Sequence, residues 1–96
     1  MARYDEALVE FKRALAIRES EDDAGATRVA RWMVAWTLRA LGRTDEALAI
    51  QLQLERENQA AGQPDPYVFE ELALLYRAMG NQALADRYAA KSMPAR

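Results

Sequence analysis

The stretch LRALGRTDEALA at residues 38–49 is the main indication of the fold, because similar sequences occur at two other places in the chain. It returns as YRAMGNQALADRY at 76–88 and, less completely, as MARYDEALVEF at 1–11. The two fuller versions join the end of one helical pattern to the start of the next through a short turn containing glycine. A turn that recurs at a nearly constant interval indicates that the same pair of helices recurs.

The interval between the copies gives the size of the repeating unit. A shift of 38 residues places Gly42 on Gly80 and Ala47 on Ala85, and a shift of 40 places Ala7 on Ala47. These three alanines each lie five residues after the turn position, which Ala2 holds in the first copy. A small side chain there lets two helices cross closely, about 8–10 Å apart. The unit is therefore a helical hairpin of about 38–40 residues.

Apolar residues recur at helical spacing along the whole chain, and no long segment alternates with period two, so we expect five helices and no sheet. The first helix begins near Tyr4 and ends at the polar stretch ESEDDAG (19–25), and the second covers about 24–41. The third runs from Thr44–Asp45 to about Ala61. The fourth begins at Pro66 and ends at Gly80, and the fifth follows Asn81 and ends before Pro94. Asp22 or Asp23 is expected to cap the second helix and Asp65 the fourth, since Asp accepts hydrogen bonds from the first free N–H groups.

Composition excludes several classes of function. Among 96 residues there is no histidine, no cysteine and a net charge of only −2. General acid–base and nucleophilic catalysis usually require His, Cys or Ser beside a base, so we expect no enzyme, no cofactor and no metal site. This near-neutral charge lacks the excess of basic residues that is typical of proteins that bind nucleic acid. The longest apolar run, WMVAWTL at 32–38, is too short for a membrane span, so we expect no membrane partner. The absence of cysteine makes a cytoplasmic location the default expectation.

The recurring residues resemble the tetratricopeptide repeat family, in a long-helix form with about two and a half repeats. The residues that carry the resemblance are Ala7, Phe11, Ala35, Leu38, Gly42, Ala47, Phe69, Leu72, Ala73, Tyr76, Gly80 and Ala85. The sequence departs from the family pattern at Arg31, where the first-helix aromatic belongs. It departs again at Gln51 and Ala89, which replace the second-helix aromatic.

The resemblance implies an all-α fold, a right-handed superhelical stack of antiparallel helix hairpins. The chain would form one domain, residues 1–96, with a half repeat at 1–23 and repeats at 24–62 and 63–96. It also implies a scaffold that binds another protein or a peptide segment and catalyses nothing. The first helix of each hairpin would line a concave groove.

The glycine registers place a set of candidate partner-binding residues in that groove: Val29, Trp32, Met33, Trp36, Arg39, Tyr67, Glu70, Leu74 and Arg77, with Glu71 beside them. Some family members grip a peptide carboxylate with cations and amides at these positions, but here Arg39 and Arg77 are the only cations. An apolar ligand, such as an amphipathic helix or a second copy of the chain, fits the two tryptophans better. A cation on that ligand could pair with Glu70 or Glu71.

Other readings of the same residues stay open. Trp32 and Trp36 could serve interior packing instead of a ligand. The arginines of residues 24–44 could form solvated faces and inter-helix pairs, or could dock onto a second protomer. The half repeat at the start is compatible with a homodimer or with a fragment of a longer array.

Overall fold

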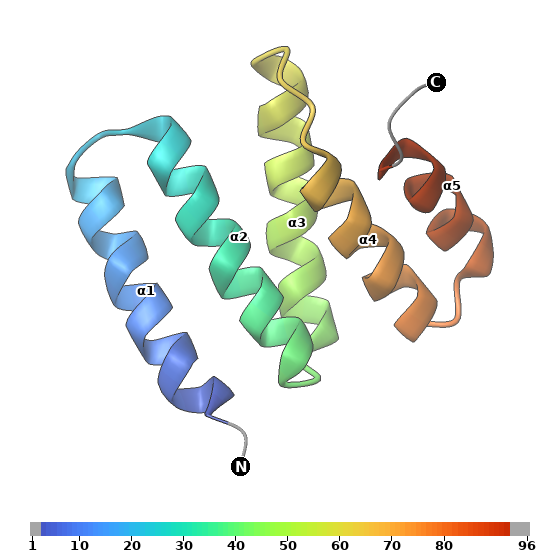
Figure 1. Cartoon of the computed structure of the whole chain (residues 1–96), viewed down its shortest axis with the longest axis horizontal. Helices are drawn as coiled ribbons and strands as arrows, with labels where there is room; N and C mark the ends of the chain where they lie inside the picture. Colours follow the sequence, from blue (N-terminus) through green and yellow to red (C-terminus); the bar gives the residue numbers. More distant parts are fainter. Residues whose placement is uncertain (1–2, 93–96) are drawn as a thin grey trace.

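Five helices make up the computed structural model, which describes residues 3–92 (Figure 1). They are α1 (Tyr4–Ser20), α2 (Ala24–Ala40), α3 (Thr44–Ala60), α4 (Pro66–Ala78) and α5 (Gln82–Ser92). No strand occurs within the described residues. The expected all-α fold with five helices is confirmed, while Ala2 and Pro94, expected at the two ends of the pattern, lie outside the described residues.

The helix starts follow from local side-chain chemistry. Asp23 is the cap of α2, and its carboxylate accepts a hydrogen bond from the backbone N–H of Ala26 at 3.0 Å. Asp65 caps α4 in the same way through the N–H of Tyr67, and Pro66 occupies the first turn, where its missing N–H costs no hydrogen bond. Both capping predictions are confirmed, with Asp23 rather than Asp22 at α2.

The turns between helices need a left-handed backbone. Gly42 and Gly80 adopt φ of +78° and +80°, which glycine reaches without steric cost. The turn between α1 and α2 has no glycine at that place and instead holds Asp22 at φ +56°. A residue with a Cβ is strained in this conformation, so the α1–α2 turn is the least relaxed of the series.

The helices form a consecutive stack. Each helix packs against the next one in the chain, and α2 also contacts α4. A long side chain of α5, Tyr88, reaches Glu55 of α3 as well. In Figure 1 the five helices accordingly follow one another across the molecule from α1 to α5. This arrangement is that of a helical repeat protein, in which each unit covers its neighbours only.

Buried apolar side chains run through the stack as two clusters. One cluster joins α1 to α4 and contains Leu8, Val34, Leu38, Ala47 and Leu75. The other joins α3 to α4 and contains Leu54, Val68 and Leu72. Each fully buried Leu or Val contributes about 1.5–3 kcal/mol relative to an exposed one, so the stack is stabilised chiefly by these contacts.

The buried stripe of α3 contains a glutamine, Gln51, whose side-chain amide has no hydrogen-bond partner. Ala47, Gln51, Leu54 and Asn58 recur at helical spacing and are all buried. Gln51 is 0% exposed, and neither its Nε2 nor its Oε1 has a hydrogen-bond partner. Leaving buried polar atoms unpaired costs free energy, so this residue weakens the core it occupies.

Candidate partner-binding face

Helices α2 and α4 carry all of the sequence-predicted binding residues, in matching register. We call these residues the α2–α4 face: Val29, Trp32, Met33, Trp36 and Arg39 on α2, and Tyr67, Glu70, Glu71, Leu74 and Arg77 on α4. Because α2 contacts α4 directly, side chains on the adjoining flanks of the two helices meet.

A pocket of about 550 Å³ opens between the N-terminal halves of α2 and α4. Val29, Trp32 and Tyr67 line it, together with the buried side chains of Leu54 and Val68. The remaining lining residues come from the start of α2, the end of α3, the α3–α4 connection and the first residue of α4: Gly25, Arg28, Asn58, Gln63, Pro64, Asp65 and Pro66. The structure thus brings three of the predicted binding residues together at one concavity of the size that ligand sites have.

Trp32 packs against the interior and also lines the pocket. Its indole packs against the cluster of Leu54, Val68 and Leu72, and Nε1 is buried without a hydrogen-bond partner. Its ring also meets Tyr67 edge-on, with centroids 6.5 Å apart, and lines the pocket. Tyr67 itself is 68% exposed, and Val29 beside it is 63% exposed. The pocket therefore has a buried inner wall and an exposed apolar rim.

Trp36 and Arg39 lie further along the same face. Tyr4 of α1 meets the Trp36 ring edge-on at 6.0 Å, and the Arg39 guanidinium lies 6.0 Å from the Trp36 ring centroid. Arg39 donates two hydrogen bonds to the Glu71 carboxylate, at 2.7 and 3.0 Å. The Glu71 side chain is only 4% exposed, so these two opposite charges satisfy each other across the α2–α4 joint.

The other predicted residues are not drawn into the pocket. Met33 and Leu74 are half-buried, whereas Glu70 and Arg77 are exposed on α4. With Glu71 paired internally, Glu70 is the acid of this face that stays exposed. The face consequently has an apolar centre and two exposed side chains of opposite charge, Glu70 and Arg77.

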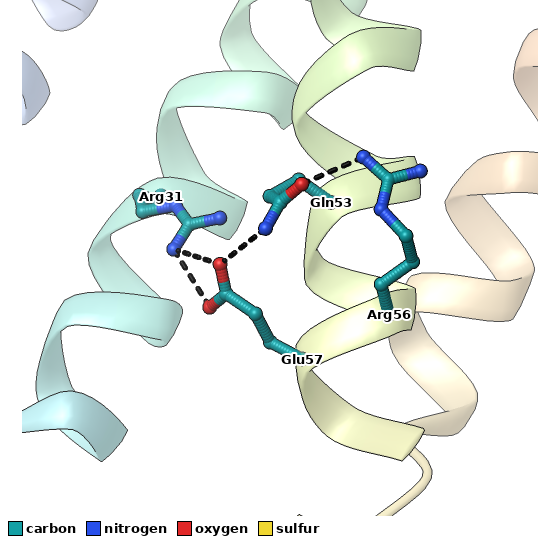
Figure 2. A network of polar contacts seen from close by, with 4 residues as sticks. All are labelled: Arg31, Gln53, Arg56 and Glu57. Carbon is teal, nitrogen blue, oxygen red and sulfur yellow. Dashed lines mark hydrogen bonds and ion pairs between the residues drawn. The ribbon is translucent and has the colours of Figure 1, made fainter. Parts of the chain in front are cut away.

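Arg31, at the position where the family pattern has an aromatic, joins α2 to α3 through an ion pair (Figure 2). It donates to both Glu57 oxygens at 2.8 and 3.0 Å, and the Gln53 amide donates to the same carboxylate at 3.0 Å. The Arg31 hydrogen bond holds the pKa of Glu57 below its usual value, although partial burial opposes this. Arg31 and Arg39 therefore form the inter-helix pairs that were one of the two readings of the arginine-rich segment.

In the α4–α5 hairpin, aromatic rings occupy the place that the Arg31–Glu57 ion pair has in the α2–α3 hairpin. Tyr88 of α5 stacks between Phe69 and Tyr76, with ring centroids 6.1 and 5.8 Å away, and its hydroxyl donates to Glu55 of α3 at 2.9 Å. Burial, and then the Glu55 carboxylate, raise the pKa of Tyr88 to about 12. The sequence places the second-helix aromatic position at Ala89, but Tyr88, one residue earlier, fills it. Its place on the inner stripe of α5 is the signal that could have found it.

The described residues form neither a cluster of metal-ligating side chains nor a membrane-spanning helix. Within the described part of the chain, no three acidic, histidine or cysteine side chains gather where they could hold a metal ion. None of the helices in residues 3–92 has the length and apolar character needed to cross a membrane. What the face offers is a pocket with aromatic walls and an exposed apolar rim, which suits the docking of an apolar side chain.

Comparison with known proteins agrees with this architecture. The family model described as Tetratricopeptide repeat matches residues 1–56, more than half of the chain. No curated protein and no solved structure matches the chain.

Proposed function

The chain belongs to the tetratricopeptide repeat family, and from this premise we propose that it is a non-catalytic scaffold that binds a segment of a partner protein on its α2–α4 face. The partner would place an apolar side chain in the pocket bounded by Val29, Trp32 and Tyr67.

The observation that supports this proposal is the pocket itself. Tyr67 and Val29 expose most of their surface at its rim, while Leu54 and Val68 close it from inside. Aromatic side chains in well-packed pockets are where protein–protein binding energy concentrates. Exposed apolar groups around a concavity also fit a docking surface better than a freely solvated one.

Site-specific photo-crosslinking tests this proposal. Tyr67 is replaced by a photoreactive phenylalanine analogue, which keeps an aromatic ring at the exposed position. A second protein carries the analogue at Ala83, an exposed residue of α5 that lies outside the face. We expect a covalent adduct with a partner protein from position 67 and none from position 83. Equal labelling from both positions, or none from position 67, would contradict the proposal.

Self-association is a second candidate function, and a separate observation favours it. Val9 and Ile17 are both exposed on α1. Apolar residues of this kind could meet the same helix of a second copy. Sedimentation at micromolar concentration distinguishes the two candidates, because a single species of 10.8 kDa would rule out a homodimer.

A further inference from the structure

We infer that Asn58 of α3 binds a side-chain carboxamide, that of a glutamine in the partner segment, inside the pocket between α2 and α4. This inference rests on the proposed function and deepens it. Beside the apolar side chain at the pocket rim, the partner would present a glutamine whose amide pairs with the amide of Asn58.

Asn58 is a buried polar residue that lines the pocket. It is 7% exposed and lies one turn after the buried Leu54 on α3. Its backbone carbonyl accepts from the N–H of Gln63 at 2.8 Å, but its side-chain amide makes no hydrogen bond within residues 3–92. The unpaired amide of Gln51 is completely enclosed, and that of Asn58 is not. The free amide of Asn58 therefore faces the open space of the pocket.

The other polar groups of the pocket leave this amide without a partner. The carboxylate of Asp65 accepts from the N–H of Tyr67 at 2.9 Å and so serves as the cap of α4. The side chain of Gln63 is exposed and has water for its own amide. Because Asn58 is more than nine-tenths buried, an occupant that completes its hydrogen bonds gains free energy that water cannot fully supply.

The chemistry of the missing group follows from the two halves of the Asn58 amide. Its NH₂ group can only donate, and its carbonyl oxygen can only accept. A carboxylate would pair with the NH₂ group and leave the carbonyl without a donor, and an ammonium or guanidinium group would do the reverse. A hydroxyl reaches both halves only through bent hydrogen bonds. A second carboxamide satisfies both halves at once, through two parallel and nearly straight hydrogen bonds.

The charges that line the pocket also favour an uncharged group. They are one base, Arg28, and one acid, Asp65. A charged tip of either sign would approach a like charge as well as an opposite one, and it would lose its hydration on entering the pocket. A carboxamide avoids both costs.

The shape of the pocket favours a side chain over main chain as the source of this carboxamide. Leu54 and Asn58 are buried in its wall, whereas Val29 and Tyr67 are exposed at its rim. Main chain would have to enter as a loop, whereas the carboxamide of glutamine lies at the end of a narrow stem of two methylenes. A cavity of about 150 Å³ accommodates a benzene ring. The pocket of about 550 Å³ therefore has room for a glutamine beside the apolar side chain of the proposed function.

Selection of fully random linear peptides against the whole chain tests the inference. We expect the enriched peptides to share a glutamine at a fixed distance from an apolar residue. Replacing that glutamine by methionine keeps the length and removes the amide, and replacing it by glutamate keeps the shape and removes the donor. Each change should weaken binding about tenfold or more.

A variant of the pocket rim separates failure of the inference from failure of the proposed function. Val29→Lys introduces a charge at an exposed position of that rim. Peptides that lose binding to Val29→Lys but need no glutamine would overturn the inference and leave the proposed function standing. Peptides that bind Val29→Lys normally, or the absence of any binder, would count against both.

Two further variants identify the residue that the glutamine contacts. Asn58→Leu removes the buried amide at nearly constant volume, and Gln63→Leu removes the exposed amide of the same pocket. Asn58→Leu should bind the glutamine peptide and its methionine form equally, whereas Gln63→Leu should keep the tenfold difference. A tenfold difference that persists in Asn58→Leu would overturn the inference. Circular dichroism checks that Asn58→Leu is folded, and if it is not, Asn58→Asp replaces it. Asn58→Asp keeps the shape but cannot donate when ionised, so it should bind the glutamine peptide about tenfold more weakly, and unchanged binding would overturn the inference.

Discussion

Replacing Gln51 by leucine should stabilise the protein. Gln51 is fully buried on α3, and neither atom of its amide has a partner. A buried polar group without a hydrogen bond costs about 1–3 kcal/mol, which leucine at this position would recover. Repacking the core around a branched side chain in place of a linear one reduces this stabilisation, typically by less than about 1.5 kcal/mol. Leucine and glutamine have similar helix propensities, so the difference reports the core alone.

We therefore expect the free energy of unfolding of Gln51→Leu to rise by about 1 kcal/mol or more. For a domain of this size that corresponds to an increase in Tm of about 4–8 °C for each kcal/mol. Urea denaturation followed by circular dichroism measures the change, and Gln59→Leu, at an exposed position of the same helix, is the control. The control should stay within about 0.5 kcal/mol of the parent. A lower unfolding free energy for Gln51→Leu would show that the amide is satisfied in the folded protein and would refute the reasoning.

Three further predictions concern single contacts. Asp22→Gly should raise the unfolding free energy by about 0.5–1 kcal/mol, because glycine adopts φ +56° without strain; thermal melting measures this, and a lower Tm would contradict it. Arg39→Leu should lower the unfolding free energy by about 3 kcal/mol, because it leaves the Glu71 carboxylate buried without its cation. Glu71→Leu added to it should restore most of the loss in urea denaturation, and strictly additive losses would disprove the pairing. Because the pKa of Tyr88 is raised to about 12 in the folded protein, the unfolded chain loses this proton first, and stability should fall as pH rises from about 10 to 12. Tyr88→Phe should remove this part of the pH dependence, and urea midpoints measured across that range would show whether it does.

Much of the fold could be predicted because local chemistry decides it. The glycines at Gly42 and Gly80 mark places where the backbone turns left-handed, and Asp65 followed by Pro66 marks a helix start. Repetition of these signals at one interval then gives the stacking of hairpins. The turn at Asp22 departs from the rule, because its left-handed residue is not a glycine and the sequence alone gave no reason to select it.

The candidate site could be predicted in part. Val29 and Tyr67 are equivalent positions on neighbouring first helices, and Trp32 lies about one turn after Val29, so the repeat pattern indicates that the three lie close together. The pairing of Arg39 with Glu71 joins residues 32 positions apart on different helices. Side-chain reach and burial at the joint decide that contact, and neither can be read from spacing. Tyr88 differs, because its helical spacing on the inner stripe of α5 could have indicated it, although the repeat alignment assigns the aromatic position to Ala89.

The two hairpins share a backbone plan but differ in what holds them closed. The α2–α3 hairpin has the Arg31–Glu57 ion pair where the α4–α5 hairpin has stacked rings of Phe69 and Tyr88. Concentrated salt screens an ion pair, whereas salts excluded from the protein surface strengthen apolar contacts. Concentrated salt should therefore weaken the closing contact of the α2–α3 hairpin more than that of the α4–α5 hairpin, and urea, which solvates apolar groups, should have the opposite preference.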